Sequence, residues 1–399
     1  MNSQNDIHGK AAGIWNPAFV KISIVSMLVQ SCFFMMNTLS PVYADSLGAP
    51  ATIVGLVSGL FALTALVFRV VSGPAIDTFN RKYVLIGSMF VLVTSFVANI
   101  VSRTIPMLVF SRLLTGVGMS FMTASSFTMA ADSLPNDRMG TGIGYFSLGT
   151  ALGGAIAPTI GLKLVETVGY TPTFVILAAV MLLAISCAMT MKTSFTPVKP
   201  FTITLSSIIA KETLVPAVIF LLLAMTSHSL NAFLVLFSQQ QGVTSNIGYF
   251  FTVSAISMLF TKLMIGKLAD RYGVVKAVAP ALLCFAAAFL LISYSRTLPM
   301  FLLAAFLTSF GFGGCHPALF ALCMKSVPEE RRGAASSTTF IGIDLGSLVG
   351  PVIAGVLAEG LGYANMWRSM MIPIFVAMLM TVLLRNKTGQ AGKAAHGAG

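Results

Sequence analysis

The chemistry open to this sequence depends on a few charged residues inside long apolar stretches, and Asp344 is the first of them. It follows Gly333 by eleven residues, which in an α-helix places it about 16 Å from the start of the stretch 333–358. No other acidic residue lies so deep in such a stretch. A carboxyl group that moves between polar and apolar surroundings can bind and release a proton. We therefore predict that Asp344 carries a proton, with a permanently paired structural aspartate as the alternative.

Four more polar residues lie well inside other apolar stretches: Asn37, Arg112, His228 and Asn231. A guanidinium costs about 2.5 to 3.5 kcal/mol or more in lipid, so Arg112 is expected to face protein or water unless it extends to the headgroups. His228 and Asn231 are three residues apart and share a helical face. We predict that all four residues line a cavity that binds a small molecule. A hydrogen-bonded core histidine is the alternative for His228.

Enzymatic chemistry has no support in the sequence. We find no phosphate-binding glycine loop, no His/Cys cluster with metal-ligand spacing and no nucleophile triad. The five cysteines lie in apolar stretches without ligand-like spacing, which indicates neither a disulfide framework nor a zinc site. We therefore expect no enzyme activity, no metal and no cofactor.

Composition places these residues in a membrane protein. Of 399 residues, 56% are hydrophobic and only 9% are charged, whereas soluble domains carry about 25% charged residues. The apolar stretches are 18–42, 51–74, 83–102, 105–131, 140–163, 170–191, 213–238, 246–266, 276–295, 298–325, 333–358 and 363–384. Each is long enough to span a bilayer as a helix. We expect an all-α protein with twelve transmembrane helices in contact with the lipid bilayer.

The charges of the loops predict the orientation of these helices. Lys and Arg concentrate in alternate loops and at the carboxyl end, while the opposite ends carry only Arg103, Lys163, Arg296 and Arg368. Because basic residues accumulate on the cytoplasmic side, both termini should be cytoplasmic, in the cell (inner) membrane. We expect no cleavable signal before residue 18. The net charge of +12 then reflects topology, and no nucleic-acid partner is implied.

The sequence repeats itself. A shift of 193 residues aligns twelve identical pairs, which are Gly73/Gly266, Asp77/Asp270, Arg103/Arg296, Pro106/Pro299, Gly118/Gly311, Pro135/Pro328, Arg138/Arg331, Gly140/Gly333, Gly153/Gly346, Pro158/Pro351, Glu166/Glu359 and Tyr170/Tyr363. A shift of 194 also pairs Asn37 with Asn231. We predict two pseudo-symmetric six-helix bundles, 1–191 and 213–399, joined by a cytoplasmic linker, 192–212. Parallel repeats of this kind are typical of rocker-type secondary transporters, with the site near the midplane between the halves.

Repeated loops carry a family signature. The segment GPAIDTFNRK contains Gly73, Asp77, Arg81 and Lys82, and its second copy contains Asp270. It resembles the signature of the major facilitator superfamily, with Asn80 at a usual glycine, where Asn also tolerates a left-handed turn. The resemblance implies that these residues act in gating and that Asp77 latches the cytoplasmic ends of the two halves, against the helix that begins near Gly333. A basic loop that only sets topology is the alternative.

Two further patterns resemble the drug/proton antiporter branch of this superfamily. Arg112, followed by glycines four and six residues later, resembles a pattern whose arginine biases a nearby proton site. Gly153 and Pro158, and Gly350 and Pro351 in the second copy of the same segment, resemble an antiporter motif and imply gating helices. Related antiporters often have an acidic residue deep in the first helix, and this chain has none there.

These observations favour a secondary active transporter with the major facilitator fold that exports a small amphipathic organic compound by alternating access. Protons are the expected coupling ions, with Asp344 and Arg112 in the coupling. A proton-coupled importer or facilitator of a sugar or organic anion is the alternative, because Arg112 and His228 could recognise charge. A non-transporting membrane sensor is a third hypothesis, disfavoured by the repeat. We expect a functional monomer.

Overall fold

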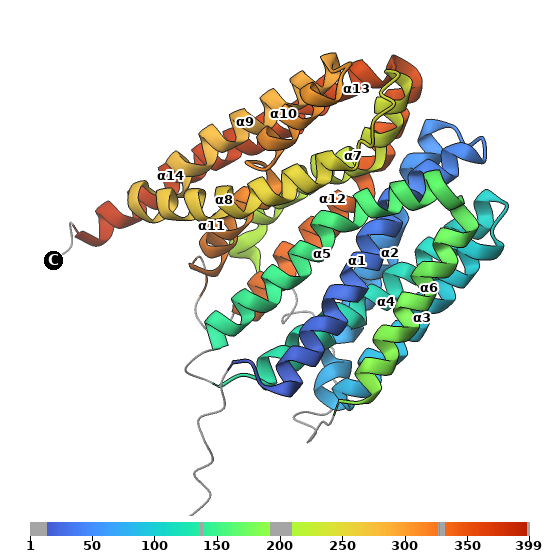
Figure 1. Cartoon of the computed structure of the whole chain (residues 1–399). Helices are drawn as coiled ribbons and strands as arrows, with labels where there is room; N and C mark the ends of the chain where they lie inside the picture. The colour runs from blue at the N-terminus through green and yellow to red at the C-terminus, as the bar shows by residue number, and fades with distance from the viewer. Residues whose placement is uncertain (1–13, 136–138, 192–209, 326, 328–331, 397–399) are drawn as a thin grey trace, which may run out of the picture.

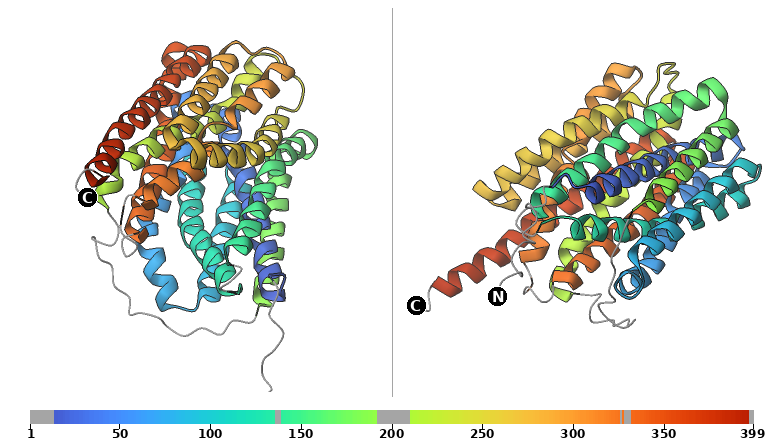
Figure 2. Two further views of the ribbon diagram at one scale, coloured as in Figure 1. Left: turned by 90° about the vertical axis from the view of Figure 1, so that its left-hand side faces the viewer. Right: turned by 60° about the horizontal axis from the view of Figure 1, so that its bottom comes forward.

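The structure is a computed structural model that describes residues 14–135, 139–191, 210–325, 327 and 332–396. Every regular element in these residues is helical. The first bundle consists of α1 (Pro17–Ser46), α2 (Ala51–Thr78), α3 (Arg81–Val101), α4 (Ile105–Asp132), α5 (Met139–Val168) and α6 (Tyr170–Met189). The second consists of η3 (Lys211–Thr213), α7 (Leu214–Gln240), α8 (Tyr249–Tyr272), α9 (Val274–Tyr294), α10 (Leu298–Thr308), α11 (Phe312–Lys325), α12 (Arg332–Leu361), α13 (Tyr363–Ser369) and α14 (Met371–His396). Figures 1 and 2 show the two bundles side by side.

Twelve spans in the described residues are long and apolar enough to cross a membrane, which confirms the predicted fold. Two predicted stretches are not single straight helices. The stretch 298–325 divides into α10 and α11 at a short turn, 309–311, that ends with Gly311. The stretch 363–384 divides into α13 and α14 at Met370, because Pro373 has no N–H to donate to the carbonyl of Ser369.

Matching turns support the internal repeat. Gly169 and Gly362, which are 193 residues apart, have φ angles of 85° and 77°. Gly48 and Gly242, which are 194 residues apart, have φ angles of 79° and 73°. A left-handed backbone favours glycine because it has no Cβ. The two halves therefore repeat backbone geometry at the connections between helices, as well as residue types.

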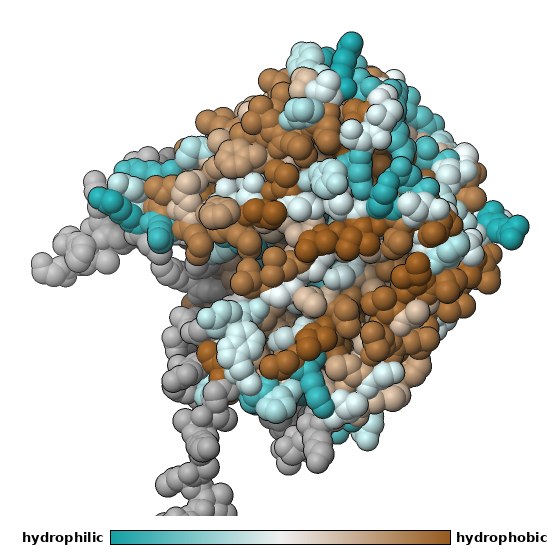
Figure 3. Space-filling view, in the orientation of Figure 1, coloured by the Kyte–Doolittle hydropathy of each residue, from teal (hydrophilic) through white to brown (hydrophobic). Residues whose placement is uncertain are grey.

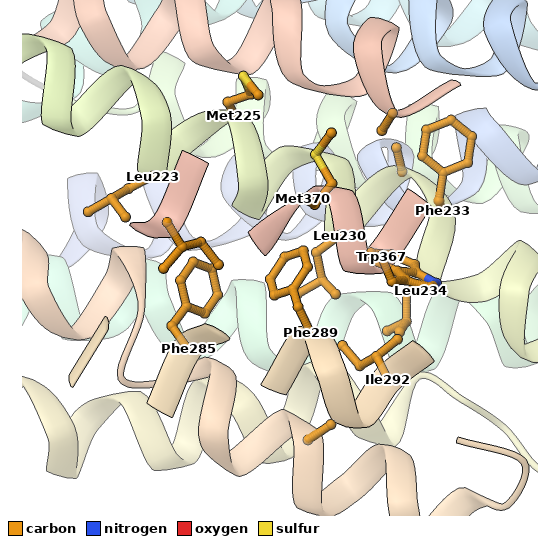
Figure 4. Packing of buried hydrophobic residues seen from close by; sticks show 14 of the residues in the cluster. Leu223, Met225, Leu230, Phe233, Leu234, Phe285, Phe289, Ile292, Trp367 and Met370 are labelled. Carbon is orange, nitrogen blue, oxygen red and sulfur yellow. The ribbon is translucent and has the colours of Figure 1, made fainter. Parts of the chain in front are cut away.

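Buried apolar residues form one cluster within the first bundle and a larger one that fills the second bundle and extends to α1, α2 and α4 of the first. In the second bundle, Phe289 of α9 and Phe237 of α7 pack edge-on against Trp367 of α13, which is fully buried (Figure 4). Apolar residues also cover much of the outer flank of the molecule, while most hydrophilic residues lie toward the helix ends (Figure 3). This pattern is the one that a lipid environment requires.

The two bundles contact each other mainly through α2 and α12, with further contacts of α5 with α8 and α1 with α7. Glycines on α2 permit the closest approach: a Cβ on Gly59 would lie 2.5 Å from the carbonyl oxygen of Leu348. Gly55 similarly faces the backbone of Pro351. Small residues let helix backbones pack closely in membranes. The α2–α12 contact is therefore the main seam between the bundles.

Polar contacts between described residues close one end of this seam. The hydroxyl of Thr52 donates to Glu359 Oε2 at 2.6 Å, and Thr159 and Thr252 are hydrogen-bonded at 2.8 Å. These residues lie at the end opposite the beginning of α1 and the end of α14. Toward the end where α1 begins and α14 ends, the ribbons of the two bundles diverge (Figure 1). We call the end at Thr52 the closed end and the other the terminal end.

Candidate functional site

Asp344 forms an ion pair with Arg69 across the seam between the bundles. Arg69 Nε donates to Asp344 Oδ2 at 2.8 Å, and Nη2 donates to Oδ1 at 3.4 Å. The side chains are 31% and 12% exposed, so the pair is only partly screened. The guanidinium also lies over the ring of Phe340, with Cζ 5.4 Å from the centroid. This contact lies closer to the terminal end than the Thr52–Glu359 and Thr159–Thr252 contacts do.

The positions of Arg69 and Asp344 follow from the α2–α12 packing. The glycines of α2 bring the backbones of α2 and α12 together at Gly55 and Gly59. Asp344 of α12 and Arg69 of α2 reach across the same seam from its two sides. The pairing is the arrangement expected of a carboxylate and a guanidinium in a membrane interior.

Sequence analysis missed Arg69. The residue lies inside the stretch 51–74, four residues before the signature that begins at Gly73. An available signal was a basic residue in the interior of an apolar span, which is costly unless it has a partner. The deep carboxylate is therefore paired in this conformation, which keeps the structural alternative for Asp344 open.

Arg112 is fully buried within the first bundle and does not contact Asp344. Its Nη2 donates to Asn37 Oδ1 at 2.7 Å, and its Nε donates to the carbonyl oxygen of Val57 at 3.1 Å. A second bond from Nη2 reaches the carbonyl oxygen of Ser58 at 3.1 Å. Nη1 has no hydrogen-bond partner among the described residues. The predicted proximity of Arg112 and Asn37 is thus observed, and the snorkelling alternative is not.

His228 reaches the same region from the second bundle. The centroid of its ring lies 6.4 Å from that of Phe61. The guanidinium of Arg112 lies over the same Phe61 ring, with Cζ 4.9 Å from the centroid. Arg112 is near enough to His228 to act on it electrostatically. Asn231 is partly buried one turn further along α7. The structure therefore gathers Asn37, Arg112 and His228 around Phe61, apart from the Arg69–Asp344 pair.

The residues predicted to act in gating lie either in the motif helices α5 and α12 or in the repeated signature loops. Gly153 of α5 packs against Met27 and Ser31 of α1, and its repeat partner Gly346 of α12 packs against Leu221 of α7 in the equivalent contact. Gly350, one turn further along α12, packs against Met225 of α7. Pro158 lies inside α5, and Pro351 lies inside α12 with its carbonyl against Gly55 of the other bundle.

The signature loop ties the first bundle together at the terminal end. Arg81 forms an ion pair with Asp132, and Lys82 Nζ donates to the carbonyl oxygen of Met189 at 2.7 Å. Asn80 has φ −60°, so it does not adopt the left-handed turn considered for it. It instead caps α3, with Oδ1 accepting from the N–H of Lys82 at 3.0 Å.

The remaining signature residues are not described in side-chain detail. The surroundings of Gly73, Asp77, Asp270 and Gly333 lie outside the described part of the structure. The latch between Asp77 and the beginning of α12 therefore stays a prediction.

A second embedded cation, Lys262, also escaped sequence analysis. It lies in the middle of α8, close enough to His316 of α11 for an electrostatic interaction. His316 stacks with Phe320 at 5.7 Å between centroids and contacts the edge of Phe220 at 5.1 Å. His316 thus lies in an aromatic environment between α7, α8 and α11.

Chemically, these groups can exchange protons and bind charge. No cluster of three or more potential metal ligands occurs among the described residues. The embedded charges described here are the Arg69–Asp344 ion pair, Arg112 and Lys262, and each of the three has a different environment. Embedded ionisable residues of this kind mark substrate or ion pathways.

Two repeated six-helix bundles with charged residues at and beside their seam define a membrane transporter. The chain belongs to the Major Facilitator Superfamily, which it matches over residues 22–244 and 214–398. It is 27% identical to an uncharacterized MFS-type transporter of Methanocaldococcus jannaschii over 339 residues, covering 82% of this chain and 87% of the relative.

Other similar proteins have more specific names. Multidrug resistance protein 1 of Bacillus subtilis is 26% identical over 80% of this chain and 84% of its own length. Multidrug resistance protein MdtG of Escherichia coli is 23% identical over 88% and 90%. The crystal structure of the nucleoside transporter NupG superposes with a TM-score of 0.78 at 15% identity, covering 92% of this chain and 99% of that one. This last similarity supports the fold.

Proposed function

We propose that this protein exports a small amphipathic organic compound in exchange for protons, and that Asp344 carries the proton. Relatives named as multidrug resistance proteins support export. The observation that carries the proposal is the ion pair of Asp344 with Arg69 between the bundles. A proton on Asp344 removes the charge that attracts Arg69, so proton binding is coupled to the contact that holds the seam.

The proposed direction of substrate and proton movement follows from the predicted orientation of the protein in the membrane. With both termini in the cytoplasm of a cell with an inner membrane, the closed end faces outside and the ribbons diverge toward the cytoplasm. Substrate would then enter from the cytoplasm while Asp344 is charged and paired. After the bundles rock, a proton from outside would neutralise Asp344 and favour the return. Asn37, Arg112, His228 and Asn231 are proposed to line the substrate path, and the gating role remains with the signature and the motif helices.

The test uses purified protein in proteoliposomes with an imposed pH gradient. Because the substrate is unidentified, the probes are 2-naphthoate, 2-naphthamide and 2-naphthylmethylammonium, which share a ring system and differ in charge. We expect Asp344→Asn to abolish accumulation driven by the pH gradient while downhill exchange of the transported probe remains measurable. Glu359→Gln is the matched control, since this acid also bridges the bundles but lies exposed at the closed end.

Three outcomes would contradict the proposal. If Asp344→Asn retains full gradient-driven transport, Asp344 does not carry the coupling proton, and His228 becomes the candidate. If neither Asp344→Asn nor His228→Gln alters the dependence on the gradient, the protein is a facilitator. Uptake in the direction of the proton gradient would instead identify an importer.

A further inference from the structure

We propose that Lys262 binds an anionic group of the substrate, so that the transported compound is a small organic anion with an apolar, planar body. This inference rests on the proposed transport function and specifies its substrate class. It is derived from the position of Lys262, from the internal repeat and from the aromatic residues nearby.

Lys262 faces the interior of the molecule. On α8 the most exposed residues are Phe260 (70%) and Leu263 (67%), and they mark the face that contacts lipid. At 100° per residue, Lys262 lies on the opposite side of the helix. Met258 and Ile265, on nearly the same side as Lys262, pack against the α11 glycines Gly313 and Gly314. Lys262 therefore points toward α11 and away from lipid.

No carboxylate or other acceptor binds Lys262 among the described residues, although the side chain is partly buried in mid-span. An ammonium group in the membrane interior normally pairs with an acid or with backbone carbonyls. Arg112, the other cation without an acid, has two backbone carbonyls and Asn37. Lys262 lacks such compensation in this conformation.

The internal repeat shows what is missing. The shift of 193 residues aligns Lys262 of α8 with Arg69 of α2, and both face away from the exposed residues Phe260 and Val67, which align with each other. The same shift aligns Asp344 with Ala151 of α5, and α5 contacts α8 as α12 contacts α2. Arg69 therefore has its carboxylate, whereas the position that the repeat aligns with this carboxylate is an alanine in the half that contains Lys262. An anionic ligand would supply the missing charge.

Aromatic residues suit the rest of such a ligand. His316 beside Lys262 stacks on Phe320, whose ring is 6.1 Å from that of Phe340, and Arg69 lies over Phe340. A continuous row of rings thus connects the two aligned cations. Planar apolar groups pack favourably on such rings. With Arg69, Arg112 and Lys262 set against Asp344 alone, the described membrane interior carries excess positive charge, which disfavours cations as ligands.

The experiment measures equilibrium binding of radiolabelled 2-naphthoate, 2-naphthamide and 2-naphthylmethylammonium to the full-length protein in detergent, without any gradient. We expect naphthoate to bind at least about tenfold more tightly than the amide and the ammonium compound to bind most weakly. Lys262→Met should abolish the preference for carboxylate over amide, and Lys262→Arg should retain it. Lys163→Met is the control, because Lys163 is exposed at the closed end and paired with Glu166.

Retention of the carboxylate preference in Lys262→Met would overturn the inference, as would tighter binding of the ammonium compound or no naphthoate binding at millimolar concentration. If Lys262→Met does not give a monodisperse protein, Lys262→Gln replaces it, because glutamine keeps a polar side chain without the charge. Retention of the carboxylate preference in that variant would overturn the inference in the same way. Binding requires no transport, so naphthoate preference without proton-driven flux would remove the export proposal alone. Proton-driven flux of the neutral or cationic probe only would remove this inference alone.

Discussion

Arg112 shows how a membrane-embedded charge can be stabilised without an acid. Its guanidinium is bonded to Asn37 and to two backbone carbonyls of α2, and it lies over Phe61. The planar group has several donors in a fixed arrangement, which a lysine could not reproduce. Arg112 therefore links α1, α2 and α4 within the first bundle, in addition to any contact with substrate.

We predict that Arg112→Ala lowers the thermal unfolding temperature and weakens transport. Asn37 Oδ1 would lose its donor, and a buried acceptor left without one costs about 1 to 3 kcal/mol. The carbonyls of Val57 and Ser58, which lie inside α2, would each lose a bond to the guanidinium. Unfolding followed by a thiol-reactive fluorophore would measure the effect. Arg368→Ala is the control, because Arg368 is exposed and, among described residues, is hydrogen-bonded only to the nearby Asn365. Equal unfolding temperatures for Arg112→Ala and wild type would refute the linking role.

At the scale of helices, α12 is packed on two sides by close backbone contacts. Gly342, Gly346 and Gly350 face α7 of the same bundle, while α2 of the other bundle presents Gly55 and Gly59 to α12. The first contact belongs to a rigid bundle and the second to the seam that must open. The two sets of glycines therefore have different consequences when they are substituted.

We predict that Gly59→Leu separates the closed end and slows export, because even its Cβ would lie 2.5 Å from the carbonyl oxygen of Leu348. Spin labels in the connections at Gly48 and Gly362 would report a longer distance by pulsed electron paramagnetic resonance. Gly87→Leu on α3 serves as the control, since a Cβ there meets no atom within 4 Å. An unchanged distance distribution in Gly59→Leu would show that α2 does not set the width of the seam.

The helices could be predicted from sequence far better than the contacts between them. Hydropathy and the repeat located all twelve spans, because lipid imposes a minimum length and composition on each. The break at Gly311 was missed, since an apolar run continues through it. Roles for Arg69 and Lys262 were not predicted, because those roles depend on which residues of neighbouring helices face them. Asn37 and Arg112 were grouped correctly by depth, but depth alone could not place Asp344 beside Arg69.

For the molecule as a whole, the orientation in the membrane is the prediction on which the direction of transport depends. We expect single cysteines introduced beside Arg138 and beside Arg331 to react with an impermeant maleimide only after cells are permeabilised. A cysteine at Lys163 should react in intact cells. The background would lack the five native cysteines, which are buried or partly buried. Labelling beside Arg138 or Arg331 from outside would reverse the topology and the direction of the proposed exchange.

The alanine at position 151 has a consequence for the energetics of the whole cycle. The described membrane interior has one carboxylate, Asp344, instead of two at symmetric positions. Each turn of the proposed cycle therefore exchanges a single proton. If that proton enters as a monovalent anion leaves, two elementary charges cross the membrane in the same electrical sense. Each charge contributes about 2.3 kcal/mol per 100 mV, against about 1.4 kcal/mol for one pH unit. Such a transporter is electrogenic, and the membrane voltage drives it more strongly than acidity does.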